Sequence, residues 1–189
     1  MGRLILVLGG ARSGKSRFAQ EYAWAMAGEN VLYVATATVT DEEMTARVER
    51  HREDRPAAWK TVELPLRVGE TLIARQALPP VILLDCLTLL LSTPAFTNAD
   101  LTAAEVEAHA TAEVDGLMRL AATHTGALVV VSNEVGMGMH PDYPIGRLYR
   151  DAFGRANQRI AAHADEAYFL LAGIPLDLTK LRAVLPAFS

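Results

Sequence analysis

The amino-acid sequence predicts an α/β protein with a doubly wound, mostly parallel sheet. Five short runs are apolar at every position, which is typical of strands that are covered on both faces. Longer segments with a helical pattern lie between these runs, and such alternation favours a parallel sheet with right-handed crossovers. A glycine-rich segment also follows the first run and precedes the first helical segment, where a phosphate-binding loop would lie.

The expected elements cover the chain from one end to the other. We expect strands at 4–8, 31–35, 81–84, 127–131 and 167–171, and helices at roughly 15–27, 41–53, 66–77, 101–124 and 145–163. Segments 92–100 and 133–145 are rich in Pro, Gly, Asn and Asp and are expected to be loops. The pattern shows no linker, so we expect residues 1–189 to form a single nucleotide-binding catalytic domain.

Composition limits the classes of function. The 189 residues are 51% hydrophobic and carry a formal net charge of −4, and nucleic-acid binders usually carry a basic face instead. We therefore expect no nucleic-acid partner. Cys86 is the only cysteine, so no intrachain disulfide can form, and we expect a cytoplasmic protein. The N-terminal apolar run is too short for a signal peptide or a membrane span.

A phosphate-binding loop, or P-loop, is the strongest motif. The pattern G-x-x-x-x-G-K-[ST] is matched in full by Gly9, Gly10, Ala11, Arg12, Ser13, Gly14, Lys15 and Ser16. Glycines let backbone amides approach phosphate oxygens, and a helix that begins near Lys15 directs its dipole at the anion. We expect Lys15 to contact the β- and γ-phosphates of a nucleoside triphosphate and Ser16 to hold Mg²⁺.

Asp85 is the candidate second ligand for the metal. It directly follows the expected strand at 81–84 and precedes Cys86. A carboxylate at the end of an apolar strand suits the Walker B role beside a P-loop, although an Asp at this point is otherwise often a helix N-cap. We interpret Cys86 as a small buried residue rather than as a nucleophile.

A histidine lies within an arginine-rich helical segment. Thr40 and Glu43 have the spacing of a capping box, and the helix that follows places Met44, Val48 and His51 on one face. Neighbouring guanidinium groups suit phosphate and disfavour protonation of the imidazole, which can then attack phosphorus. The arginines of this segment are Arg47, Arg50, Arg52 and Arg55. From the residue pattern alone, a surface helix with a bystander histidine is the favoured interpretation.

Taken together, the motifs resemble one enzyme family over roughly residues 3–175. They are the P-loop and the blocks 33–37, 41–47, 51–63, 84–88, 132–138 and 154–158, which include His-Arg-x-x-Arg-Pro-x-x-Trp and Asn-Glu-Val-Gly-Met-Gly. This combination closely resembles the bifunctional adenosylcobinamide kinase / adenosylcobinamide-phosphate guanylyltransferases of cobalamin biosynthesis. The segment 92–104 and the tail after Pro175 match the family weakly.

The resemblance implies a function and a set of site residues. The family phosphorylates adenosylcobinamide with ATP or GTP, and then transfers GMP from GTP to adenosylcobinamide phosphate through a guanylyl-histidine. That histidine matches His51 here, which reverses the preference from pattern alone, and Lys15 is the second catalytic residue. The implied nucleotide contacts are Gly9–Ser16, Ala35, Thr36, Ala37, Arg52, Glu53, Asp54, Arg55, Glu63 and Asp85. The resemblance also implies a RecA-like core and a homotrimer.

Two other functions stay open at this point. A different P-loop kinase of small molecules would transfer only a γ-phosphate, and a non-catalytic nucleotide-binding module would turn nothing over. His51 among arginines is the feature that argues against the plain kinase. Asn133 and Glu134 follow the fourth expected strand, where they either face the site or cap the loop.

Overall fold

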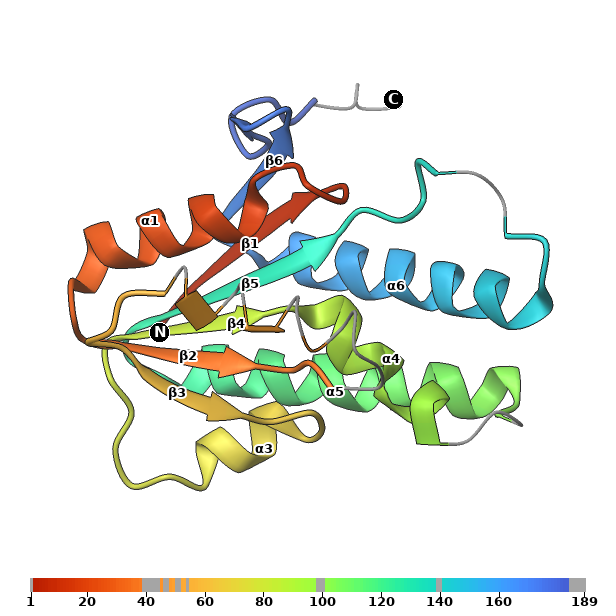
Figure 1. Cartoon of the computed structure of the whole chain (residues 1–189), viewed down its shortest axis with the longest axis horizontal. Coiled ribbons are helices and arrows are strands. Elements are labelled where there is room, and N and C mark those ends of the chain that lie inside the picture. Colours follow the sequence, from red (N-terminus) through yellow and green to blue (C-terminus); the bar gives the residue numbers. More distant parts are fainter. Residues whose placement is uncertain are drawn as a thin grey trace, which may run out of the picture.

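A seven-stranded sheet forms the centre of the computed structural model, in the order β3-β2-β4-β5-β1-β6-β7 (Figure 1). The structure describes residues 2–38, 45, 48–49, 52–53, 55–97, 101–138 and 141–183, with 94–97 described by their backbone alone. Neighbouring strands pair in parallel except at the β6–β7 hairpin. The strands are β1 (Arg3–Gly9), β2 (Val31–Ala35), β3 (Lys60–Glu63), β4 (Val81–Asp85), β5 (Ala127–Asn133), β6 (Glu166–Leu171) and β7 (Ile174–Asp177).

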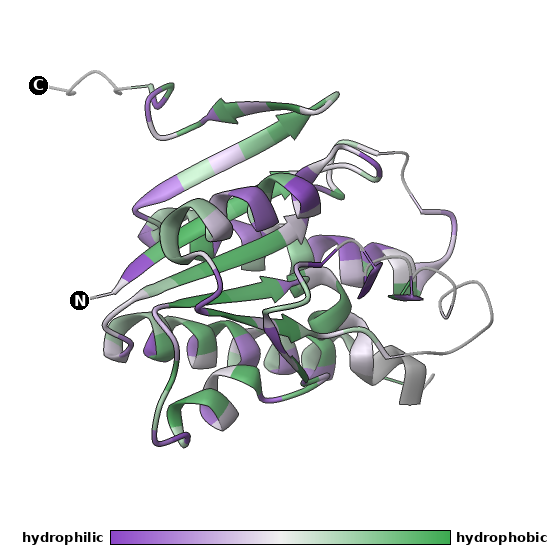
Figure 2. Ribbon diagram, turned by 60° about the vertical axis from the view of Figure 1, so that its left-hand side comes forward, coloured by the Kyte–Doolittle hydropathy of each residue, from purple (hydrophilic) through white to green (hydrophobic). Residues whose placement is uncertain are grey.

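Helices cover both faces of this sheet. The described helices are α1 (Lys15–Ala27), α3 (Val68–Ile73), α4 (Leu87–Thr97), α5 (Ala103–Thr123) and α6 (Pro144–His163). One apolar cluster joins the sheet to α1, and a larger one joins the opposite face to α3, α4, α5 and α6. Both faces of the central strands are therefore buried, which is why these strands are hydrophobic along their length (Figure 2).

The sheet order places β5 between the strand that leads into the P-loop and the strand that ends at Asp85. Gly9 is in register with Asn133 across β1 and β5, and Asp85 is in register with Val131 across β4 and β5. This insertion is the arrangement of the RecA-type core. The prediction of a doubly wound, mostly parallel α/β fold is confirmed, together with its RecA-like type.

One expected loop is helical over most of its length. The composition of segment 92–100, with Pro94 within it, predicts a loop, but α4 continues through Thr97. A proline in a helix cannot donate to the carbonyl four residues earlier, which here is Leu90 O. His109 Nε2 on α5 lies 3.4 Å from that oxygen. A neighbouring helix thus provides a polar partner for the carbonyl that Pro94 leaves free, and the sequence pattern does not reveal it.

Two edge strands are absent from the elements that the sequence predicts. β3 lies at one edge of the sheet, and of its residues only Val62 packs against the core, so it lacks a continuous apolar run. β7 contains Pro175, which argues against a strand, but an edge strand tolerates proline because only one side of it is paired. The expected helix at 66–77 is also shorter in the structure, where α3 ends at Ile73.

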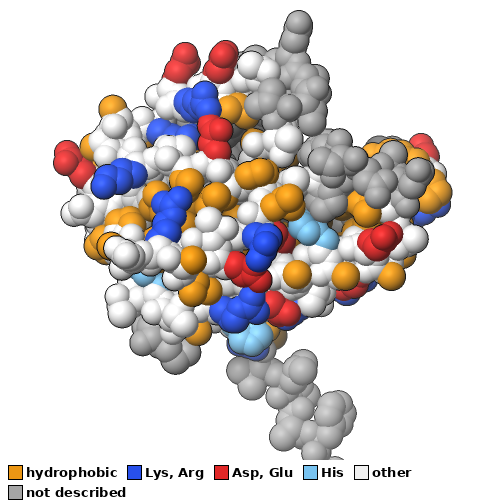
Figure 3. Space-filling view, turned by 90° about the horizontal axis from the view of Figure 1, so that it is seen from below, with side chains coloured by type: hydrophobic (Ala, Val, Ile, Leu, Met, Phe, Trp, Pro, Cys, Tyr) orange, Lys and Arg blue, Asp and Glu red, His pale blue; other side chains and the backbone are white. Residues whose placement is uncertain are grey.

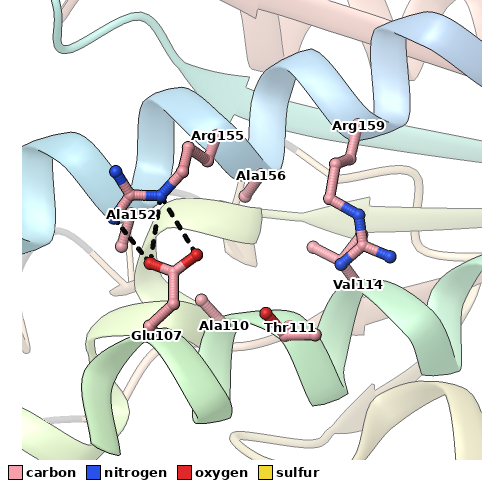
Figure 4. A pocket seen from close by; sticks show the side chains of 8 residues that line it. All are labelled: Glu107, Ala110, Thr111, Val114, Ala152, Arg155, Ala156 and Arg159. Carbon is pink, nitrogen blue, oxygen red and sulfur yellow. Dashed lines mark hydrogen bonds and ion pairs between the residues drawn. The ribbon is translucent and has the colours of Figure 1, made fainter. Parts of the chain in front are cut away.

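The helical layer opposite α1 is held by apolar packing and by ion pairs at its surface. Arg155 on α6 donates to both carboxylate oxygens of Glu107 on α5, above a small hollow lined by Ala110, Ala152 and Ala156 (Figure 4). On the face that carries α3, basic and acidic side chains are interspersed (Figure 3). Glu70 there pairs with Arg67 at 2.6 Å and with Arg119 at 3.6 Å. No helix among the described residues is long and apolar enough to cross a membrane.

Candidate active site

The P-loop runs from the end of β1 to the first turn of α1. Gly14 takes a left-handed conformation with φ of 92°, and its carbonyl accepts the Phe18 amide at 2.9 Å to begin the helix. A Cβ on Gly9 would lie 3.0 Å from Leu170 O and would overlap the Ser13 side chain. The glycines at these two positions are therefore required by the backbone path of the loop.

Two polar groups inside this loop are suited to phosphate. Lys15 is only 7% exposed, and its Nζ donates to Gly10 O at 3.1 Å, so the ammonium lies back across the loop. The Ser13 hydroxyl is buried and has no hydrogen-bond partner among the described residues. A buried polar group without a protein partner is available to a bound ligand or to water. The loop therefore has the polar groups that an anion requires.

The same edge of the sheet brings further site candidates together. Side chains alternate between the two faces of a strand, and Leu83 in β4 and Val131 in β5 pack on the face that carries α1. Two residues further along these strands, Asp85 and Asn133 continue the alternation on that face. Asn133 is in register with Gly9, so it lies between the start of the P-loop and the strand that ends at Asp85. The carboxyl ends of three neighbouring strands thus bring two polar residues beside the P-loop.

Thr36 links the ends of β2 and β4 through hydrogen bonds. It is fully buried, its hydroxyl donates to Cys86 O at 2.7 Å, and the same oxygen accepts the Cys86 amide at 2.9 Å. Of the three residues predicted at 35–37 to contact nucleotide, Thr36 therefore uses its hydroxyl within the protein. Burial and the neighbouring Asp85 carboxylate raise the pKa of the Cys86 thiol to about 11, which fits the interpretation of Cys86 as an unreactive buried residue.

Asp85 has a hydrogen-bond donor that the sequence did not suggest. The Tyr33 hydroxyl donates to Asp85 Oδ2 at 2.8 Å, and Tyr33 is only 1% exposed. Burial, followed by the charge of Asp85, raises the pKa of the Tyr33 phenol. The Arg55 guanidinium carbon lies 3.7 Å from the centre of the Tyr33 ring, a cation–π contact. Two predicted nucleotide contacts, Arg55 and Asp85, thus meet at one tyrosine.

The segment that carries the candidate nucleophile is described only in part. His51 and Asp54 lie outside the described residues. Arg52 and Glu63, both predicted to contact nucleotide, form an ion pair at the surface, and Glu53 is exposed beside Arg52. Because Glu63 ends β3, this pair joins the helical residues at 52–53 to the carboxyl edge of the sheet.

The donor set at this edge suits Mg²⁺. The Ser16 hydroxyl and the Asp85 carboxylate are hard oxygen ligands, and Mg²⁺ commonly binds through one carboxylate, substrate phosphates and water. Among the described residues, no three His, Cys, Asp or Glu side chains gather to hold a metal ion by themselves. A hydroxyl and a single carboxylate are the protein ligands expected for a metal that binds together with nucleotide phosphates.

Sequence reasoning also missed the residues that hold Asn133. The backbone N–H of Asn133 donates to Thr88 Oγ1 at 2.9 Å, and its backbone carbonyl oxygen accepts a hydrogen bond from Asn157 Nδ2 at 3.0 Å. The Ser132 hydroxyl donates to Asn157 Oδ1 at 2.7 Å. The only signals were the blocks 84–88 and 154–158, which belong to the resemblance and contain Thr88 and Asn157, but these two residues had no assigned role. Glu134 Oε1 accepts the Gly136 amide at 2.7 Å, which is the loop-capping arrangement.

Comparison with known proteins identifies the family of this chain. Residues 5–178 match the family described as cobinamide kinase / cobinamide phosphate guanyltransferase. The chain belongs to this family. The prediction of a bifunctional kinase and guanylyltransferase family of cobalamin biosynthesis is therefore confirmed, and the P-loop described above is part of the matched region.

Named relatives within the family match over nearly their whole length. The bifunctional adenosylcobalamin biosynthesis protein CobU of Escherichia coli is 39% identical over 90% of this chain and 97% of its own. CobU of Salmonella typhimurium is 38% identical over the same shares. The bifunctional adenosylcobalamin biosynthesis protein CobP of Pseudomonas aeruginosa is 38% identical over 92% of this chain and 95% of its own.

Solved structures with a similar fold are much more distant. The flagellar accessory protein FlaH of Methanocaldococcus jannaschii is 14% identical, with a TM-score of 0.46 over 92% of this chain and 75% of its own. The RadB recombinase is 15% identical, with a TM-score of 0.46 over 89% of this chain and 74% of its own.

Proposed function

We propose that this chain catalyses both reactions named for its family. It phosphorylates the aminopropanol hydroxyl of adenosylcobinamide with ATP or GTP. It then transfers GMP from GTP to adenosylcobinamide phosphate, giving adenosylcobinamide-GDP and pyrophosphate. The observation that carries this proposal is the P-loop, in which the buried Lys15 lies across the loop and the Ser13 hydroxyl has no partner among the described residues.

Each predicted site residue has a role in this proposal. Lys15 neutralises the β- and γ-phosphates, and Ser16 and Asp85 hold Mg²⁺ with the nucleotide. When bound, the metal neutralises charge on the phosphate oxygens. The proposed nucleotide contacts are Gly9–Ser16, Ala35, Thr36, Ala37, Arg52, Glu53, Asp54, Arg55, Glu63 and Asp85. The clustering of Asp85, Tyr33 and Arg55 supports the assignment of Asp85 and Arg55 to one site.

His51 is the proposed nucleophile of the second reaction. Its neutral imidazole nitrogen attacks the α-phosphorus of GTP, the bond from that phosphorus to the bridging oxygen breaks, and pyrophosphate leaves. A phosphate oxygen of adenosylcobinamide phosphate then attacks the same phosphorus, and the imidazole is released. Arg52 and Arg55 supply guanidinium groups that suit the charge on the phosphates.

Incubation with GTP radioactive at the α-phosphate tests this function. We expect the protein to become labelled through a phosphoramidate that is stable in base and labile in acid. Addition of adenosylcobinamide phosphate should remove the label and form adenosylcobinamide-GDP. His51→Ala should abolish labelling and GMP transfer while GTP binding, measured by calorimetry, is retained.

A matched histidine variant and the other functions complete the test. His163 is exposed at the end of α6, and His163→Ala should leave labelling unchanged. Labelling that persists in His51→Ala would refute the assignment of the nucleophile. Transfer of a γ-phosphate without covalent GMP would favour another P-loop kinase, and binding without any turnover would favour a nucleotide-binding module.

The proposed assembly is a homotrimer, and the proposed compartment is the cytoplasm. Support for association comes from large apolar side chains on and after the β6–β7 hairpin, since Leu171, Ile174 and Leu181 are 60%, 62% and 67% exposed. Light scattering during gel filtration should give three times the chain mass of 20.5 kDa. A monomer would contradict the trimer without affecting the proposed reactions.

A further inference from the structure

Tyr33 connects two parts of the proposed site. It lies on β2 opposite Leu83 of β4, and Asp85 is two residues further along β4 on the same face. A long side chain can contact such a diagonal neighbour across a sheet. Its hydroxyl reaches Asp85 Oδ2 at 2.8 Å, from a side chain that is almost completely buried.

The second connection is through the ring of the same residue. The guanidinium of Arg55 lies over the Tyr33 ring, at 3.7 Å from its centre. Arg55 is the last arginine of the segment that contains His51. The ring thus contacts a cation that belongs to the proposed nucleophile segment, and the Tyr33 hydroxyl contacts the proposed metal ligand.

We propose that Tyr33 is a positioning residue, which fixes the Asp85 carboxylate through Oδ2 and leaves Oδ1 for the metal that accompanies the nucleotide. The inference rests on the proposed function, because it takes Asp85 to be a metal ligand. A carboxylate at the end of a strand can rotate about its side-chain bonds, and a buried donor to one oxygen removes much of that freedom. Hydrogen-bond partners of metal-ligating carboxylates typically affect metal affinity by about 10- to 100-fold.

Tyr33→Phe separates this role from a purely structural one. The variant keeps the ring under Arg55 and removes only the hydroxyl. Binding of Mn²⁺ to the GTP-saturated protein, measured by electron paramagnetic resonance, should weaken about 10-fold or more. GTP affinity in the presence of EDTA should change by less than about threefold, because Lys15 and the loop amides are untouched.

Tyr168→Phe is the matched control. Tyr168 also donates to a carboxylate, Glu166 Oε2 at 2.6 Å, but it lies on β6 beyond β1 and away from Asp85. Its removal should leave Mn²⁺ affinity unchanged. A general effect of losing a phenol that donates to a carboxylate would appear in both variants and would overturn the positioning role.

Comparison with Asp85→Asn separates failure of the inference from failure of the proposed function. If Tyr33 acts through Asp85, the double variant Tyr33→Phe/Asp85→Asn should bind Mn²⁺ no more weakly than Asp85→Asn alone. Additive losses would overturn the inference, as would unchanged Mn²⁺ affinity in a folded Tyr33→Phe. An Asp85→Asn variant with unchanged Mn²⁺ affinity would overturn both this inference and the proposed metal site.

Discussion

The Gly173 amide donates a hydrogen bond to the Ser13 carbonyl oxygen at 3.0 Å. Gly173 is the second residue of the turn between β6 and β7, and its φ is 82°. A Cβ on Gly14 would also lie 3.4 Å from Gly173 Cα, so the turn packs directly on the P-loop. The antiparallel hairpin at the sheet edge is therefore a support for the phosphate-binding loop.

Gly173→Ala is expected to weaken nucleotide binding. A non-glycine residue at this φ costs roughly 1–2 kcal/mol, and relaxation of the turn would move the Ser13 carbonyl. We expect the Kd for GTP, measured by calorimetry, to rise about threefold to tenfold. Gly28→Ala is the control, because Gly28 also has a positive φ of 56° and open space at its Cβ, but it caps the far end of α1. Equal effects of both variants on GTP affinity would contradict the supporting role.

The crossing of α3 and α5 depends on one glycine more than on its partner. A Cβ on Gly69 would overlap the Gly116 carbonyl and lie 2.7 Å from Gly116 Cα, whereas a Cβ on Gly116 would lie 3.6 Å from Gly69 Cα. Gly69→Ala must push two helix backbones apart and should reduce the free energy of unfolding by about 2–3 kcal/mol. Gly116→Ala should be neutral or stabilise by up to about 1 kcal/mol through helix propensity. Urea denaturation distinguishes the two, and equal losses would show that the crossing is not asymmetric.

The central strands were predictable, and the edges of the sheet were not. β1, β2, β4, β5 and β6 are apolar without interruption over most of their length, because helices or neighbouring segments cover them. Edge strands need less apolar surface, and β3 and β7 resemble loops in sequence. The length of α4 was not predictable because the partner of the Leu90 carbonyl is His109, on another helix. That residues 1–189 form one domain stays a prediction.

The candidate site was predictable where the chemistry lies within one motif. The P-loop could be identified from its glycines, Lys15 and Ser16, because the backbone itself forms the site. Tyr33 could not, since its role depends on the register of β2 with β4, which no local pattern reveals. The role of Asn157 could not be predicted either, because the two residues that it contacts at the end of β5 are 25 and 24 residues away in sequence. The role of His51 stays a prediction.

Asn157→Ala is expected to destabilise the end of β5. Asn157 is only 5% exposed, and the substitution removes the hydrogen-bond partners of the Ser132 hydroxyl and of the Asn133 backbone carbonyl. Loss of the two hydrogen bonds should lower the free energy of unfolding by about 2–4 kcal/mol, as measured in urea. Gln158→Ala, at the next and exposed position of α6, should change it by less than about 0.5 kcal/mol. Similar small effects in both variants would mean that water replaces the Asn157 amide.

The Tyr168 phenol should ionise at a higher pH than a free tyrosine, and the free energy of unfolding should fall at high pH as a result. Partial burial, followed by the hydrogen bond with Tyr22, raises the pKa of Tyr168 to about 12. Because the folded-state pKa is raised above the ordinary value of about 10, the folded state holds this proton more tightly than the unfolded state. The resulting stabilisation is complete below pH ~10 and is lost as the pH rises through the folded-state value. The difference in absorbance at 295 nm between wild type and Tyr168→Phe should titrate near the folded-state value, and a midpoint near that of a free phenol would refute the shift.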